Sequence, residues 1–125
     1  MQLNLDFIMK KFLSYSVFIV VALTATTAQA QLFKTNLAVT VRDEVGNIVE
    51  GATLQLYETE DDYKAEKNMV AETVSDDKGV ARFRDIKPLA YFVLVRKDDK
   101  NNFGGGEQTA QLEEGKFNRV TIVIQ

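Results

Sequence analysis

Histidine, cysteine and tryptophan are absent from this chain, and proline occurs only once. Without histidine or cysteine, the nucleophile systems that pair serine or cysteine with histidine cannot form within the chain. Zinc sites are excluded on the same ground, because nearly all of them use one of these two residue types. The lack of cysteine also removes disulfides, so the fold depends on packing and hydrogen bonds alone. We expect a protein without enzymatic activity and without a cofactor.

Long apolar runs are scarce too, and the one present has the flanks of a secretion signal. A basic pair precedes the run of residues 12–23, and a small-x-small motif ending at Ala30 follows it, as signal peptidase requires. The run is too short for a membrane span, which needs about 20 apolar residues. We predict a signal peptide over residues 1–30, with translation starting at Met9. The mature chain should begin at Gln31 and be exported to the periplasm or secreted, without a membrane span.

Positive charge is also limited, since 15 basic residues face 18 acidic ones and the net charge is −3 at pH 7. Nucleic-acid binding favours basic stripes, so we expect no nucleic-acid partner. Residues 31–125 have a length typical of one domain with a modest core. We expect this domain to be a monomer.

What the chain does contain is a series of short segments in which apolar and polar residues alternate. Residues 37–42 show the period of two that indicates a half-buried strand, and Leu54 and Leu56 resume it. Residues 90–95 are apolar on both faces, which predicts the most enclosed strand. Further strands are expected over residues 69–74, 80–86, 107–112 (a polar edge strand) and 119–124. Seven short strands separated by turns predict an all-β fold, a seven-stranded antiparallel Greek-key β-sandwich.

Two turns share the pattern Asp-x-x-Gly. Asp43 and Gly46 form the first, and Asp76 and Gly79 form the second. Aspartate suits the first position of a type I turn, and glycine suits a later position with positive φ. We therefore predict positive φ angles at both glycines, where a residue with a Cβ would be strained.

Two longer segments lack a strand pattern and are predicted to be loops. Residues 58–68 are highly charged, and Asp61 is expected to cap a short helix over residues 62–67. Residues 98–106 are polar and rich in glycine, which indicates a long exposed loop. Each loop contains one aromatic residue among polar ones.

The order of these elements resembles that of carboxypeptidase regulatory-like domains, whose relatives include the collagen-adhesin B-type repeats and transthyretin. The resemblance covers residues 36–125 and implies a transthyretin-like sandwich. Such domains often precede outer-membrane transporters or decorate enzymes and adhesins, which implies a binding or assembly module; a stand-alone copy departs from that arrangement. The segments that carry the resemblance are the strand of residues 37–41, the turn of residues 43–46, the Gly51-Ala52 step, the turn of residues 76–79 and the strand of residues 91–95.

Two chemistries found among such relatives are not expected here. The transthyretin-like hydroxyisourate hydrolases depend on histidines and on a terminal motif of Tyr-Arg-Gly-Ser type, and this chain has neither. Many adhesin repeats join a lysine of the first strand to an asparagine or aspartate of the last, assisted by a buried glutamate or aspartate. Here Ala38 and Val41 stand where relatives place lysine, and residues 91–95 contain no acid. Lys34 and Asn118 lie at the margins of the two strands, and we expect no crosslink between them.

Three segments have compositions that ligand sites also use. The acidic residues of segment 58–62 and the polar residues of segment 98–102 offer oxygen ligands for calcium, but neither has the glycine and bidentate glutamate of an EF-hand loop. We interpret both as solvated loops and predict no metal site. Residues 104–106 are all glycine, but phosphate-binding loops open a helix, whereas a strand is expected here.

Loops on a rigid sandwich usually carry its function, so the two long loops are the predicted contact region. The candidate residues are Tyr63, Asn101, Asn102 and Phe103. We expect an exported, non-catalytic module that binds a protein or glycan partner through them. A carbohydrate-binding module is the alternative, because related sandwiches include starch-binding modules, although these usually display tryptophan. A small hydrolase that uses loop carboxylates is a remote alternative.

Overall fold

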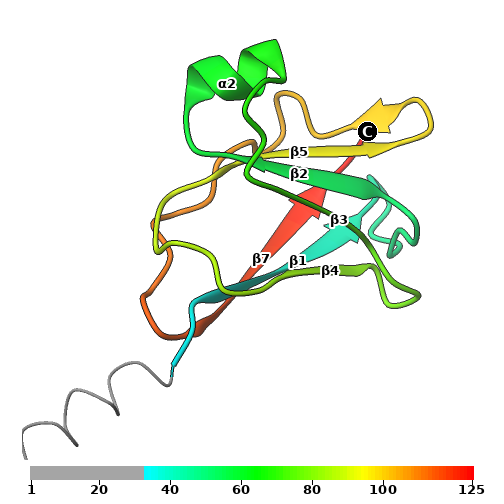
Figure 1. Ribbon diagram of the computed structural model, residues 1–125. Coiled ribbons are helices and arrows are strands. Elements are labelled where there is room, and N and C mark those ends of the chain that lie inside the picture. The colour runs from blue at the N-terminus through cyan, green and yellow to red at the C-terminus, as the bar shows by residue number, and fades with distance from the viewer. Residues whose placement is uncertain (1–32) are drawn as a thin grey trace, which may run out of the picture. The chain divides into compact units, whose positions relative to one another are not determined.

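A computed structural model describes residues 33–125, which contain seven strands and one helix (Figure 1). The predicted signal peptide, the start at Met9 and the cleavage site between Ala30 and Gln31 lie outside the described residues. Within the described range, no helix is long and apolar enough to cross a membrane. In chain order the elements are β1 (Asn36–Arg42), β2 (Thr53–Tyr57), α2 (Glu60–Ala65), β3 (Ala71–Val74), β4 (Val80–Phe83), β5 (Phe92–Lys97), β6 (Lys100–Asn101) and β7 (Phe117–Val123).

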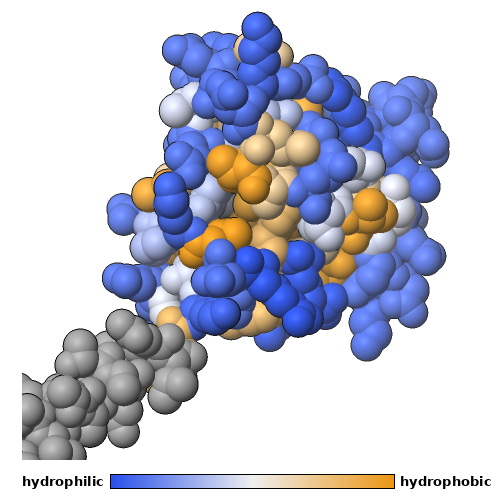
Figure 2. All heavy atoms as spheres, in the orientation of Figure 1, coloured by the Kyte–Doolittle hydropathy of each residue, from blue (hydrophilic) through white to orange (hydrophobic). Residues whose placement is uncertain are grey.

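The strands form two sheets that pack against each other as a sandwich (Figure 1). One sheet has three strands in the order β4-β1-β7, and the other has four in the order β3-β2-β5-β6. The alternation seen in the sequence directs apolar side chains of both sheets into one core, among them Leu37, Val39, Leu54, Val93 and Ile122. Figure 2 shows hydrophilic residues over most of the visible face, with smaller apolar patches between them. The prediction of an all-β sandwich is confirmed.

One strand pairing differs from the predicted antiparallel arrangement. β1 and β7 run parallel, with Val39 opposite Val120, whereas the other paired strands run antiparallel. Parallel neighbours need a long crossover connection, and the first and last strands have the whole sandwich between them in sequence. The prediction of an entirely antiparallel sandwich is therefore wrong at this pair, because the alternation of side chains carries no information on strand direction.

β5 is enclosed on both faces, as its sequence indicates. Val93 and Val95 point into the core between the sheets and are fully buried. On the opposite face, Leu94 is buried together with Tyr57 of β2 and Tyr63 of α2. The helix therefore covers part of the outer face of the four-stranded sheet, which explains why this strand is apolar on both sides.

The short helix is present, but its cap is not the predicted residue. Thr59 is the N-cap, and its side-chain oxygen accepts a hydrogen bond of 3.1 Å from the Asp62 amide. Asp61 instead lies in the first turn, with Glu60 and Asp62, where negative charge favours the positive end of the helix dipole. The prediction of an Asp61 cap is wrong because the helix begins two residues earlier than expected.

The predicted edge strand over residues 107–112 and the predicted loop over residues 98–106 are both wrong in part. Residues 107–109 run along the edge of β5: Val93 N donates a hydrogen bond to Glu107 O (2.8 Å), and Thr109 N donates one to Tyr91 O (2.9 Å). The chain then turns away from β5. Only an isolated bridge forms there, so the segment is extended without being a strand. The seventh strand is β6, which lies inside the expected loop and pairs with the end of β5.

The two Asp-x-x-Gly turns are confirmed and share one hydrogen-bond pattern. The Asp43 carboxylate accepts bonds from the amides two and four residues later, and the Asp76 carboxylate does the same. Gly46 has a φ of 90° and Gly79 a φ of 74°, in the region that favours glycine. Each aspartate thus satisfies the amides of its turn, while each glycine supplies the backbone geometry.

Candidate functional site

The two predicted loops do meet, but one of the two aromatic rings is buried. The ring centroids of Tyr63 and Phe103 are 6.2 Å apart. Tyr63 is only 4% exposed and also packs against Tyr57 and Phe92, at 6.0 and 5.7 Å. The expectation of an exposed Tyr63 is therefore wrong, because the ring anchors α2 to the sheet. Phe103 is 45% exposed and remains at the surface.

The two predicted amide residues are held by backbone contacts. Asn102 is fully buried: its Oδ1 accepts a bond of 3.0 Å from Val95 N, and its Nδ2 donates to Val93 O at 2.7 Å and to Gly106 O at 3.1 Å. Asn101 is half-buried, and its Oδ1 accepts a bond from Phe103 N. The expectation that Asn102 lies exposed is wrong, because its amide continues the edge of β5 in place of a strand.

The hydroxyl of Tyr63 is buried and has no hydrogen-bond partner among residues 33–125. Burial, and then the negative charge of Glu107 and the approach of its side chain to the hydroxyl, raise the pKa of Tyr63 above its ordinary value, although no group meets hydrogen-bond geometry with the hydroxyl. An unpaired buried hydroxyl destabilises a fold, so its removal should be favourable.

We expect Tyr63→Phe to raise the free energy of unfolding by about 1 kcal/mol, because it removes this unpaired group and keeps the ring. Tyr91→Phe is the matched control. It should lower stability, because the Tyr91 hydroxyl donates a bond of 2.8 Å to Lys87 O. Urea denaturation of both variants checks the prediction, and a loss of stability in Tyr63→Phe would contradict it.

The two residues considered for a crosslink each have other partners. The Lys34 Nζ atom lies 3.5 Å from an Asp85 carboxylate oxygen. The Asn118 Nδ2 atom donates to the carbonyls of Asn36 and Glu113, at 3.2 and 3.1 Å. Within the described residues, no group of three or more metal-ligand side chains is close enough to hold a metal ion.

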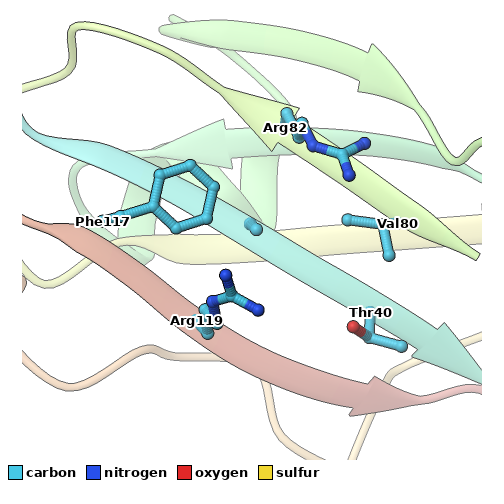
Figure 3. Close-up of a pocket in the computed structure, with 6 residues that line it drawn as sticks. Thr40, Val80, Arg82, Phe117 and Arg119 are labelled. Carbon is cyan, nitrogen blue, oxygen red and sulfur yellow. The ribbon is translucent and has the colours of Figure 1, made fainter.

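A different candidate lies on the outer face of the three-stranded sheet (Figure 3). A hollow of about 120 Å³ opens there between side chains of all three strands. We call it the arginine hollow; it is lined by Ala38 and Thr40 of β1, Val80 and Arg82 of β4, and Phe117 and Arg119 of β7.

The strand register places two arginines on either side of the smallest side chain. Ala38 is paired with Arg82 on one neighbouring strand and with Arg119 on the other. Two inter-strand spacings separate the arginines, so their backbones are about 10 Å apart. Figure 3 shows both guanidinium groups on the same side of the sheet, one on each side of β1. Ala38 therefore forms the floor between two cations.

The two arginines differ in their charge partners. The Arg82 Nη1 atom lies 2.7 Å from an Asp76 carboxylate oxygen. The Val80 amide, and then the Arg82 guanidinium, hold the pKa of Asp76 below its ordinary value of 3.8. Arg119 lies over the Phe117 ring, 5.2 Å from its centroid, and no carboxylate within residues 33–125 is at ion-pair distance from it. The hollow thus has one neutralised cation and one available cation.

This arrangement is suited to binding an anion. Arginine presents a planar fork of donors that matches carboxylate, sulfate or phosphate oxygens. The sequence alone does not reveal this site, because its members lie in three strands that are far apart in the chain. The only local signal is that Phe117 and Arg119 occupy alternate, outward positions of one strand.

Comparison with known proteins supports the fold but assigns the chain to no family. No family model matches the chain, and no curated protein matches it. One similar solved structure is the Bacillus anthracis TIE protein, with a TM-score of 0.51 and 17% identity over 71% of this chain and 16% of that chain. The group B streptococcus pilus 2b backbone protein has a TM-score of 0.49 and 12% identity over 73% of this chain and 40% of that chain. Chlorocatechol 1,2-dioxygenase from Pseudomonas putida has a TM-score of 0.46 and 17% identity over 74% of this chain and 60% of that chain. The chain spans less than two thirds of each of them. The likeness to the first shows a β-sandwich fold alone.

Proposed function

We propose that this chain is an exported, non-catalytic binding module of carboxypeptidase regulatory-like type, and that the arginine hollow binds an acidic group of its partner. The observation that carries this proposal is Arg119, a cation on a rigid sheet with no carboxylate partner among the described residues. Arg82 stands across Ala38 from it and adds a second set of donors. Acidic residues outnumber basic ones in this chain, whose net charge is −3, yet the arginine hollow presents guanidinium groups.

The size of the hollow favours a surface contact over an enclosed ligand. Its volume of about 120 Å³ is small, whereas pockets for small molecules usually have about 300–1,000 Å³. A single acidic group of a larger partner fits such a space. Contacts of this kind usually belong to macromolecular ligands that extend beyond the hollow.

Catalysis has no support in the hollow. Arginine stays protonated and does not act as a general base. The nearby Asp76 carboxylate accepts bonds from Lys78 N, Val80 N and Arg82, so it is committed to the turn. A hydrolase acting in the hollow would need a carboxylate free to accept a proton, and Asp76 is not free, so we propose binding and not hydrolysis at this site.

An acidic polysaccharide is the second candidate ligand. Phe117 is 49% exposed and lies beside Arg119. An exposed ring next to an arginine can stack on a sugar while the guanidinium binds a uronate. This observation keeps carbohydrate binding as the alternative to a protein partner.

The charge requirement can be tested with immobilised acidic and neutral probes. Alginate and an alternating Thr-Glu peptide supply carboxylates, while dextran and an alternating Thr-Gln peptide are their neutral counterparts. We expect at least one acidic probe to bind, and Arg119→Gln to weaken that binding about tenfold, because a charge-assisted hydrogen bond contributes about 1.5–3 kcal/mol.

Lys67→Gln is the matched control, since it removes one exposed positive charge in the segment after α2, the helix that covers part of the other sheet. It should leave binding unchanged. Equal binding of neutral and acidic probes, or equal losses in Arg119→Gln and Lys67→Gln, would contradict the proposed function. Thermal melting of both variants confirms that the fold is intact.

A further inference from the structure

β7 is a long edge strand: among residues 33–125 no strand pairs with the outer edge of Phe117–Val123, and only beyond it does Gln125 exchange two backbone hydrogen bonds with Asn101 of β6. It has seven residues and pairs only with β1. The other strands at sheet edges are shorter: β3 and β4 have four residues each and β6 has two. Natural proteins usually shorten, charge or interrupt such edges, because an open edge is a template for another strand. β7 contains no proline, and most of its residues favour strands.

Two hydrogen bonds at its ends show which backbone groups of β7 point outward. Asn36 N donates to Lys116 O at 3.1 Å, and Ile124 N donates to Arg42 O at 2.9 Å. In a parallel ladder alternate residues turn their backbone groups to one neighbour, so the even-numbered residues of β7 face β1. The amides and carbonyls of Phe117, Arg119 and Thr121 therefore point to the open edge.

A groove runs beside this edge. It has a volume of about 220 Å³ and lies between β7 and residues 106–110, which follow the edge of the other sheet. Its lining is small or uncharged, so it offers no charge that would repel an approaching chain. We call it the edge groove; it is lined by Gly106, Gln108, Thr109, Ala110, Val120, Thr121 and Ile122.

We propose that an extended acidic segment of a partner protein adds to the open edge of β7 as a further strand. The partner backbone pairs with Arg119 and Thr121, and a glutamate or aspartate side chain of the partner enters the arginine hollow beside Arg119. The inference rests on the proposed function, because the arginine hollow recognises the acidic group.

The geometry of β7 allows one partner strand to pair with its open edge and to reach the arginine hollow. Arg119 turns its side chain to the arginine hollow and its backbone to the open edge. Side chains of neighbouring strands on the same face lie about 5 Å apart, and an opposite-charge pair there is favourable. A strand added to β7 thus brings every second side chain next to the arginine hollow. Acidic residues at alternate positions are the matching pattern.

Two other occupants of the open edge, a second copy of this chain and an acidic polysaccharide, fit it less well. If β7 paired with β7 of a second copy, both Arg119 side chains would lie on adjoining strands, where like charges are unfavourable. An acidic polysaccharide satisfies the guanidinium but lacks the amides and carbonyls that continue a sheet. An extended acidic peptide satisfies both.

The probe is the alternating Thr-Glu heptapeptide, measured by calorimetric titration against the exported protein. We expect Arg119→Gln to weaken binding about tenfold and the corresponding Thr-Gln peptide to bind far more weakly. A Thr-Glu peptide methylated on alternate backbone nitrogens should not bind, because the methyl groups block strand pairing.

Thr121→Pro tests the edge directly, because proline removes an amide that points away from β1. Its matched control is Val74→Pro in β3. There the bond from Ser75 N to Ala52 O shows that the Val74 amide also points to an open edge. We expect Thr121→Pro to abolish binding and Val74→Pro to preserve it. Hydrogen exchange in the unmodified protein provides a second readout, in which the amides of Phe117, Arg119 and Thr121 gain protection when the Thr-Glu peptide binds.

The outcomes separate this inference from the proposed function. Binding that needs Arg119 but tolerates backbone methylation and Thr121→Pro places the peptide on the sheet face, which overturns strand addition and leaves the proposed function standing. Arg119-dependent binding of alginate without peptide binding has the same meaning. Peptide binding that is indifferent to Arg119 overturns both. Dimerisation of the free protein through β7 would also overturn the inference.

Discussion

Replacing Asn102 with alanine should lower the free energy of unfolding by about 3–4 kcal/mol, because it leaves buried backbone groups unpaired. Val95 N and Val93 O both bond to the Asn102 amide in a buried environment, and Gly106 O accepts a third bond. A buried donor or acceptor without a partner costs about 1–3 kcal/mol. Urea denaturation followed by circular dichroism measures the loss.

Two further variants show whether the loss comes from these bonds. Asn101→Ala removes the neighbouring amide, which accepts one exposed bond, and should cost less than about 1 kcal/mol. Asn102→Asp keeps the acceptor for Val95 N but turns a carboxylate oxygen toward two carbonyls. It should be as harmful as alanine at neutral pH and recover partly in acid, where a protonated carboxyl can donate. A cost in Asn102→Ala no greater than that in Asn101→Ala would show that the amide does not support β5.

Gly79→Ala should destabilise the protein more than Gly46→Ala, although both glycines have positive φ. A Cβ at Gly79 would lie 2.9 Å from Ile48 Cβ, 3.1 Å from Val41 O and 3.2 Å from Val49 N. These neighbours cannot yield easily, because Val49 N donates to Val41 O at 2.9 Å and Val41 N donates to Gly79 O at 2.7 Å. At Gly46 no atom lies within 4 Å of the added carbon.

We expect Gly46→Ala to cost about 1–2 kcal/mol from the left-handed backbone alone. Gly79→Ala should cost about 1–3 kcal/mol more, which is the usual cost of inserting atoms into a packed site. Calorimetric melting of the two variants gives the difference directly, since the backbone strain is common to both. Equal losses would mean that the close approach at Gly79 relaxes without cost.

The exposure of the predicted contact residues could not be inferred from the sequence alone. Tyr63 and Asn102 lie in polar, charged or glycine-rich surroundings in the sequence, which indicates exposure. In the structure Tyr63 packs against three aromatic rings and Asn102 replaces a strand in binding β5. Nothing local distinguishes an aromatic residue that binds a ligand from one that anchors a loop, because the partners of both are distant in sequence.

The sequence by itself determined six of the seven strands, the two turns and which residue types are missing. Alternation with a period of two is a property of each strand taken alone, and the Asp-x-x-Gly turns close through bonds within a few residues. The absence of histidine and cysteine needs no structure at all. Each of these conclusions depends on residues that are close in the chain.

Only the tertiary structure decided which strands are neighbours and in which direction they run. The parallel pairing of β1 with β7 brings Ala38 and Arg119 together, and the antiparallel pairing with β4 adds Arg82. Strand order is set by how two apolar faces bury each other, which depends on the whole chain at once. The arginine hollow and the open edge of β7 both follow from that order, so the surfaces proposed to bind a partner could not be found from the sequence.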